Sequence, residues 1–333
     1  MRPFLLLTTL AITTLASAQD TPYKILKTAK VGGAGGFDYV YADSSGRRLY
    51  IPRTGAGARI TVFNLDTLES VGEIANANAR GAAVDPKSGH GFGSSKPVAM
   101  WDSKTLAPIK TIDVEGGPDG IMFDPFNNRV WIFSHRAPNA TVINAADGAI
   151  AGTIDLGGAP EQAASDGKGH LYVDIEDKDK IAVVDAKTLT VTAQYDLTGK
   201  GGGCAGLALD IKNHILFATC REPQNMVILD SNDGKIITTL PIGRGTDGAV
   251  FNPKTMEAFS SQGDGTLTIV KENSPTSFVV EQTLQTKVSA KTLTLDSKTG
   301  HILLIAADFG PTPAGERRGP MLPDSFSILE VGK

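Results

Sequence analysis

Short apolar segments alternate with polar turns along almost the whole chain, and one arrangement of two segments around a turn recurs seven times. Each instance is a short apolar stretch, a turn that opens with Asp or Asn, and a second apolar stretch, as in ALDIKNHILFA and TLDSKTGHILLI. Such segments bounded by turn residues predict β-hairpins. The turns open 39–44 residues apart, at Asp43, Asp85, Asp124, Asp166, Asp210, Asn252 and Asp296.

A second hairpin pattern follows the first in most of the repeats, as in IAVVDAKTLTVTAQY and MVILDSNDGKIITTL. Each repeat therefore holds four short strands, which is typical of one blade of a β-propeller. Seven repeats predict an all-β protein, a seven-bladed propeller of four-stranded antiparallel blades. An open solenoid and a two-sheet sandwich are the alternatives, although a sandwich does not explain a seven-fold period.

The two ends of the chain supply strands that complete the last repeat. The C-terminal stretch DSFSILEVGK reads as a strand without a partner, and YKILKTAKV, from Tyr23 to Val31, is a strand without a repeat of its own. We expect the two to pair and to close the ring in the last blade, since closure protects strand edges. Residues 19–333 then form a single propeller domain.

The N-terminal residues have the features of a signal peptide. Arg2 precedes the mostly apolar stretch from Phe4 to Leu15, and Ala16-Ser17-Ala18 is a small-x-small cleavage pattern. We expect cleavage near Ala18, so that residues 1–18 are removed and the mature protein is periplasmic or secreted, without membrane insertion. The net charge of −4 and the lack of a basic block argue against nucleic-acid binding. We also expect a monomer.

Several stretches carry a resemblance to a known family, namely GGFDYVYAD, GGPDGIMFDP, GGAPEQAASDGKGHLYVDIEDK, SSQGDGTLTIVKENSP and ADFGPTPAGERRGPMLPDSFSILEVG. With these stretches the chain resembles the bacterial YVTN-repeat, YncE-like propellers over nearly its whole mature length. The resemblance implies a periplasmic seven-bladed propeller, and it raises DNA binding, against which the charge counts. Propellers host many functions, so the resemblance is a poor guide to chemistry.

Propeller geometry assigns polar residues to one of two faces. The turns between the first and second strands (a–b) and between the third and fourth (c–d) share one face. Four of the five histidines fall there, as do the repeated acids, which we expect to cap the turns by accepting backbone N–H groups. These histidines are His90, His170, His214 and His301, and the acids of the c–d turns are Asp66, Asp102, Asp185 and Asp230.

The opposite face, formed by the b–c loops and the crossovers between blades, is the mouth of the axial channel and the predicted ligand site. The crossovers contribute one residue per blade at nearly equivalent positions: Asp38, Arg80, Asp119, Glu161, Cys204, Asp247 and Lys291. The b–c loops add Arg53, His135, Asp174, Glu176, Arg221 and Asp308. Two interpretations stay open: these residues neutralise one another by ion pairing, or they bind a small charged or hydroxylated ligand.

Three functions are compatible with this face. The first is a binding module for a small molecule or a periplasmic protein. The second is an enzyme, such as a lactonase-like hydrolase or a lyase, with His135 and carboxylates as acid and base; the sequence has no GxSxG or HExxH motif. The third is a quinoprotein, which the two tryptophans, Trp101 and Trp131, do not favour because both lie inside strand patterns. No cofactor is expected, although clustered carboxylates could hold calcium.

Two further features of the sequence bear on the mouth. The stretch from 308 to 324 is far longer than the other b–c loops, so it could cover the mouth or reach a partner with Arg317 and Arg318. Cys204 and Cys220, the two cysteines of the chain, flank one predicted hairpin. If the turn centres near Lys212, the cysteines face each other, and an oxidising compartment favours a disulfide.

Overall fold

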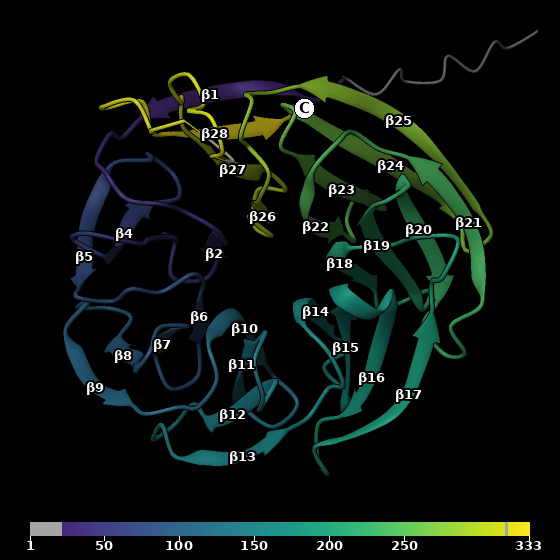
Figure 1. Cartoon of the computed structure of the whole chain (residues 1–333), viewed down its shortest axis with the longest axis horizontal. Coiled ribbons are helices and arrows are strands. Elements are labelled where there is room, and N and C mark those ends of the chain that lie inside the picture. The colour runs from purple at the N-terminus through teal and green to yellow at the C-terminus, as the bar shows by residue number, and fades with distance from the viewer. Residues whose placement is uncertain (1–21, 317–318) are drawn as a thin grey trace, which may run out of the picture.

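The computed structural model describes residues 22–316 and 319–333, which form seven four-stranded antiparallel sheets in a ring around one axis (Figure 1). The predicted seven-bladed propeller is confirmed. The signal peptide predicted for residues 1–18 lies outside the described residues. No helix in the described part of the chain is long and apolar enough to cross a membrane.

Each blade has its strands in chain order from the axis outward, except the last. Blades one and two consist of β2 (Tyr41–Asp43), β3 (Arg48–Arg53), β4 (Arg59–Asn64) and β5 (Ser70–Ala75), then β6 (Ala82–Asp85), β7 (His90–Gly93), β8 (Val98–Asp102) and β9 (Pro108–Ile112). Blades three and four consist of β10 (Pro118–Asp124), β11 (Arg129–Ser134), β12 (Ala140–Asn144) and β13 (Ile150–Ile154), then β14 (Pro160–Ser165), β15 (His170–Ile175), the 3₁₀ turn η1 (Glu176–Lys178), β16 (Lys180–Asp185) and β17 (Thr190–Asp196).

The remaining blades follow the same plan. Blades five and six consist of β18 (Cys204–Asp210), β19 (Ile215–Arg221), β20 (Gln224–Asp230) and β21 (Ile236–Pro241), then β22 (Thr246–Asn252), β23 (Glu257–Gln262), β24 (Thr266–Ser274) and β25 (Ser277–Gln285). Blade seven consists of β26 (Leu293–Leu295), β27 (Ile302–Ala306), β28 (Ser327–Gly332) and β1 (Lys24–Lys30).

The apolar pattern of each strand matches its place in the blade. The two middle strands are covered on both faces by neighbouring blades, so β11 reads VWIF and buries all four of those residues. The outer strand β9 is exposed at four of its five positions and carries a lysine. The core is accordingly divided into clusters between adjacent blades.

The aspartates that open the turns cap them, as predicted for the a–b turns. Asp85, for example, accepts hydrogen bonds from the backbone N–H groups of Lys87 (2.9 Å) and Ser88 (3.2 Å). One predicted cap in a c–d turn is wrong: Asn64 accepts the N–H of Asp66 at 2.7 Å, and the Asp66 carboxylate binds Arg47 instead. Asn64 is the last residue of β4, which is the position that the capping aspartates occupy in other blades.

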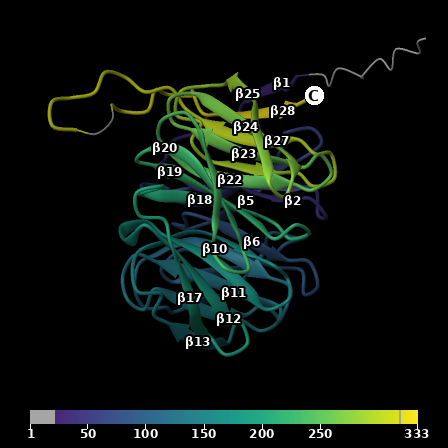
Figure 2. The same cartoon turned by 90° about the vertical axis from the view of Figure 1, so that its right-hand side faces the viewer.

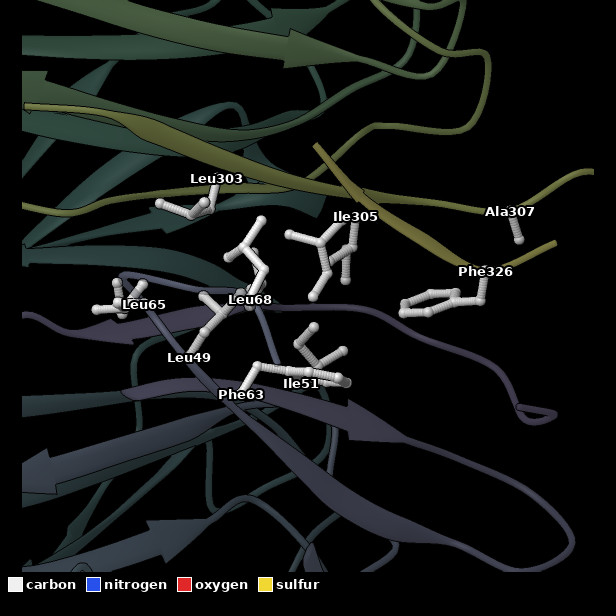
Figure 3. Close-up of a cluster of buried hydrophobic side chains, with 12 residues drawn as sticks. Leu49, Ile51, Phe63, Leu65, Leu68, Leu303, Ile305, Ala307 and Phe326 are labelled. Carbon is white, nitrogen blue, oxygen red and sulfur yellow. The ribbon is translucent and has the colours of Figure 1, made fainter. Parts of the chain in front are cut away.

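Ring closure follows the prediction, because the N-terminal strand β1 pairs antiparallel with β28 and completes blade seven. Apolar side chains of blade one and blade seven meet behind this closure (Figure 3). Leu49, Ile51 and Phe63 face Leu303 and Ile305 there, and all five are buried. The interface between the first and the last blade is therefore packed like the other contacts between blades.

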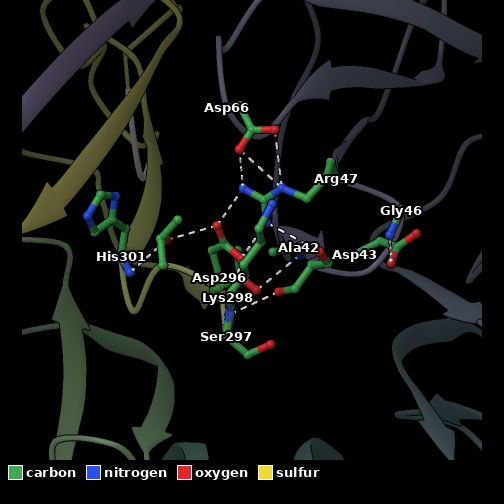
Figure 4. Close-up of polar contacts among 12 residues, drawn as sticks. Ala42, Asp43, Gly46, Arg47, Asp66, Asp296, Ser297, Lys298 and His301 are labelled. Carbon is green, nitrogen blue, oxygen red and sulfur yellow. Dashed lines mark hydrogen bonds and ion pairs between the residues drawn. The ribbon is translucent and has the colours of Figure 1, made fainter.

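A buried ion pair joins the same two blades on the a–b turn face (Figure 4). Arg47, in the first turn of blade one, contacts both carboxylate oxygens of Asp296 in blade seven, at 2.7 and 2.8 Å. Burial raises the pKa of Asp296, but hydrogen bonds from Arg47, Thr299 and the backbone of Lys298 outweigh it and lower that pKa to about 2. Asp296 therefore stabilises the folded protein in its ionised form.

We expect Asp296→Asn to lower the free energy of unfolding by about 2 kcal/mol at pH 7, the loss typical of hydrogen bonds to a charged group. Because the pKa of Asp296 is lowered on folding, its contribution is complete above pH 4 and is lost as the pH falls toward 2. Urea unfolding at pH 7 and pH 3 measures the free energy of unfolding of both proteins. The difference between the variant and wild type should be smaller at pH 3 than at pH 7. Asp66→Asn, at the half-exposed partner of Arg47, should change little. A difference that widens on acidification would contradict the assignment.

The long segment between β27 and β28 extends from the body of the propeller, shown in yellow in Figure 2. One isolated bridge, between Phe309 and Met321, holds its base together. The predicted roles of Arg317 and Arg318 fall on residues outside the described part of the chain.

Candidate functional site

Irregularities in the innermost strands aim three of the crossover residues into the channel mouth. The pairing of β10 with β11 and of β14 with β15 shifts register where Asp119 and Glu161 stand, and the pairing of β22 with β23 shifts at Asp247. β-bulges of this kind redirect side chains at the rims of closed sheets. These three residues therefore reach the mouth through irregular strand ends, whereas Asp38, Arg80 and Lys291 reach it from the crossovers that precede β2, β6 and β26.

The converging side chains form a chain of ionic contacts around the mouth, with one interruption in blade four. Arg80 binds Asp38 (2.9 Å) and also approaches Asp119 (3.6 Å). His135, the first residue after β11, places Nε2 3.4 Å from Asp119 and 3.3 Å from Glu161. Half of the ring thus runs from blade one to blade four with alternating charge.

The other half of the ring returns from blade four to blade one. Arg221 contacts Glu176 through Nη1 and Asp247 through Nη2, the latter at 2.5 Å. Lys291 contacts Asp247 and lies 3.2 Å from Asp38, which brings the contacts back to blade one. The predicted ion pairing of these residues is therefore present in the structure.

Charge alternation fails at one link of the described ring, in blade four. Glu161 and Glu176 are adjacent carboxylates, and together with Nε2 of His135 their oxygens lie within 4.8 Å of one another. Asp174 is fully buried two residues before Glu176 and has no hydrogen-bond partner for either carboxylate oxygen among the described residues. Blade four therefore holds three acidic side chains next to only two cationic partners in the ring, His135 and Arg221.

The environment shifts the ionisation of this cluster. Hydrogen bonding to Glu161 raises the pKa of His135 to about 9, against the opposing effect of burial, so the imidazole is charged at neutral pH. Burial raises the pKa of Glu161, and the nearby Glu176 raises it further. Burial also raises the pKa of Asp174, with Glu161 and Glu176 adding to the effect. A further positive charge near Glu161 and Asp174 would lower both pKa values and favour the ionised forms.

A cavity of about 250 Å³ lies directly below the ring and is mostly apolar. Its walls include Ile121, Met122, Phe133 and Leu293, and Glu161 and Gln162 are among its polar lining residues. A charged mouth over an apolar shaft suits a ligand with one positively charged end and one apolar end.

The structure separates some predicted site residues from the ring. Arg53 is 1% exposed; its guanidinium lies 3.7 Å from the centre of the Phe326 ring and donates to the carbonyls of Gly33 and Gly35. Burial lowers the pKa of Arg53 to about 10. Asp308 contacts Lys287 at 3.1 Å in blade seven and is half exposed. Arg53 therefore has a packing role, and Asp308 forms an ion pair outside the ring.

Other residues considered from the sequence also lie away from the ring. Trp101 and Trp131 are fully buried in two different clusters between blades. Cys204 and Cys220 form a disulfide, as predicted, at the mouth end of the hairpin of blade five. The sulfur atoms are therefore not available as ligands, but the bridge adjoins Arg221 of the ring.

Two polar residues of the mouth were missed in the sequence, and both directly follow a predicted ring position. Tyr39 donates to Glu161 across the channel at 2.8 Å. Gln162 accepts the N–H groups of Leu207 and Ala249 and donates to the carbonyl of Ala249, which links blades four, five and six. Gln162 lies in the irregular stretch of β14, and Tyr39 lies in the crossover before β2. Their position next to ring residues is the signal that could have found them.

Comparisons with solved structures agree with the propeller architecture. The chain matches a chain of the structure described as "Crystal Structure of Mitotic Checkpoint Complex", with a TM-score of 0.75 and 9% identity, over 100% of this chain and 99% of that chain. It matches the "Structure of U3-55K" with a TM-score of 0.72 and 9% identity, over 92% of this chain and 98% of that chain. No family model and no curated protein matches the sequence. At such low identity the likeness shows the WD40-like propeller fold alone.

Proposed function

We propose that this chain is a YVTN-type propeller that acts outside the cytoplasm and binds a small, positively charged ligand at the channel mouth. The observation that carries the proposal is the carboxylate excess in blade four, where Glu161 and Glu176 adjoin and Asp174 is buried behind them. Three acidic groups beside two cationic side chains leave one acid without a counter-charge, and a bound cation would offset the cost of burying it. The apolar cavity below gives room for the uncharged part of a ligand.

Two features support the proposed compartment and family. The disulfide between Cys204 and Cys220 is the kind of crosslink that persists in oxidising compartments. The N-terminal sequence has the features of a signal peptide, and the repeats carry the YVTN-like stretches such as GGPDGIMFDP.

Alkylammonium ions are suitable probes of the proposed site. We expect octylammonium to bind more tightly than butylammonium, because a longer chain buries more apolar surface in the cavity, and octyl sulfate not to bind. Glu161→Gln and Glu176→Gln should each weaken ammonium binding about fivefold to tenfold, a graded loss typical of a binding site. Isothermal titration calorimetry measures these affinities. Asp147→Asn, at an exposed turn on the opposite face, is the matched control. Equal affinity for the ammonium and the sulfate would refute the proposal.

A second candidate, a hydrolase or lyase, has one specific observation in its favour. His135 lies 3.3 Å from Glu161, whose pKa is raised by burial, so two ionisable groups that could exchange a proton adjoin in one site. An enzyme would lose nearly all of its rate on His135→Ala, whereas a binding site would lose affinity gradually. Turnover of a panel of lactones by wild type and not by this variant would favour the enzyme.

A further inference from the structure

The carboxylate excess in blade four has the composition of a metal site. His135 offers one imidazole nitrogen, and Glu161 and Glu176 each offer carboxylate oxygens, all within 4.8 Å of one another. Bonds to Zn²⁺ from nitrogen or oxygen are about 2.0–2.2 Å long, so ligand atoms of one ion lie within about 4.4 Å of one another. Small side-chain rotations that move the ligand atoms by a few tenths of an ångström would bring the three groups to that spacing.

The buried carboxyl group of Asp174 is an independent indication of a cation. It is fully buried, its two oxygens have no partner among the described residues, and the charged groups that act on it are Glu161 and Glu176. The irregular pairing between β14 and β15 places Asp174 opposite the stretch that holds Glu161. A fully buried carboxyl group whose two oxygens lack a hydrogen-bond partner costs free energy, and an ion bound beside it would offset that cost.

We propose that His135, Glu161 and Glu176 bind one divalent transition-metal ion, Zn²⁺ or Mn²⁺, with the buried carboxyl group of Asp174 beside them. The inference rests on the proposed function, because it names the positively charged ligand of the same mouth. The imidazole ligand favours these ions over Ca²⁺, which takes oxygen ligands and would need more of them. Arg221 contacts Oε1 of Glu176, which leaves Oε2 for the ion. Binding replaces the proton on Nε2 of His135.

Calorimetry on the tag-free full chain, after dialysis against EDTA, tests the site with ZnCl₂, MnCl₂ and CaCl₂ in separate titrations. We expect one Zn²⁺ or Mn²⁺ per chain, with Ca²⁺ at least tenfold weaker. His135→Ala and Glu176→Gln should each lower the affinity at least tenfold. His170→Ala is the matched control, because His170 also contacts a carboxylate but lies on the opposite face. Unchanged affinity in the two site variants would overturn the inference.

A second measurement separates metal binding from a structural role of the same residues. In EDTA, Glu176→Gln removes one of two adjacent like charges but weakens the contact with Arg221 to a hydrogen bond with a neutral amide, so its melting temperature should stay close to that of wild type. With the metal, wild type should melt at a higher temperature than in EDTA, and the variant should not shift. Octylammonium should compete with the metal. If the ammonium binds and none of the metal ions does, a shared proton occupies the pair of Glu161 and Glu176, and only the metal inference fails. If neither the ammonium nor a metal ion binds, the proposed function fails as well.

Discussion

Replacing Phe326 with alanine is expected to lower the free energy of unfolding by about 3–5 kcal/mol, the usual cost of truncating a buried aromatic side chain. Phe326 is fully buried in the cluster between blades one and seven (Figure 3). It packs edge-on against Phe37, with ring centres 5.0 Å apart, and against the guanidinium of Arg53. The truncation therefore leaves a cavity and also removes the aromatic ring against which the buried guanidinium of Arg53 packs.

Chemical denaturation monitored by circular dichroism measures this loss, with Phe126→Ala as the matched control. Phe126 is 41% exposed in an a–b turn of blade three, so its truncation should change the free energy of unfolding by less than about 1 kcal/mol. Equal effects of the two substitutions would show that the interface between the first and the last blade does not limit stability.

Removing the disulfide with the double substitution Cys204→Ala and Cys220→Ala is expected to lower the free energy of unfolding by about 3 kcal/mol. The bridge closes a loop with a sequence separation of 16, and the loss of that constraint frees the unfolded chain. The hairpin ladder between β18 and β19 remains hydrogen-bonded, so the fold should survive.

The same double variant has a functional readout, because Arg221 follows Cys220 directly and spans Glu176 and Asp247. We expect weaker octylammonium binding in the variant, by severalfold, as the loop that carries Arg221 loosens. Wild type treated with a reducing agent is the control, since it should match the variant in stability. Two free thiols in the untreated wild-type protein would contradict the bridge altogether.

The hairpin of the disulfide illustrates how far the sequence interpretation reached. A turn centred near Lys212 predicted Cys204 opposite Cys220, and the two do pair. The ladder is in fact centred between Lys212 and Asn213, since Asp210 pairs with Ile215, and a register shift at the mouth end restores the cysteine pair. The prediction of the partners was therefore confirmed, although the regular register behind it was off by one position.

The ring of the mouth was largely accessible from the sequence for the same reason. Repeats of equal plan place each crossover at an equivalent position, so Asp38, Asp119 and Lys291 could be grouped without a structure. Arg53 ends the second strand of its blade, as Arg221 does, and Glu176 directly follows the second strand of its own blade. Arg53 is nevertheless buried against Phe326. A neighbouring blade decides that difference, and the repeat pattern does not record it.

The sequence by itself determined the number of blades, their strand order, the closure by the N-terminal strand and the two faces, because hairpin turns and strand periodicity are local properties. Only the tertiary structure decided which ring charges touch, where Gln162 crosses the channel, and that Glu161 and Glu176 adjoin with Asp174 buried behind them. Those contacts depend on bulges that redirect side chains and on packing between blades. Bulges and packing between blades bring together residues that lie far apart in the sequence, and sequence separation does not predict such distances.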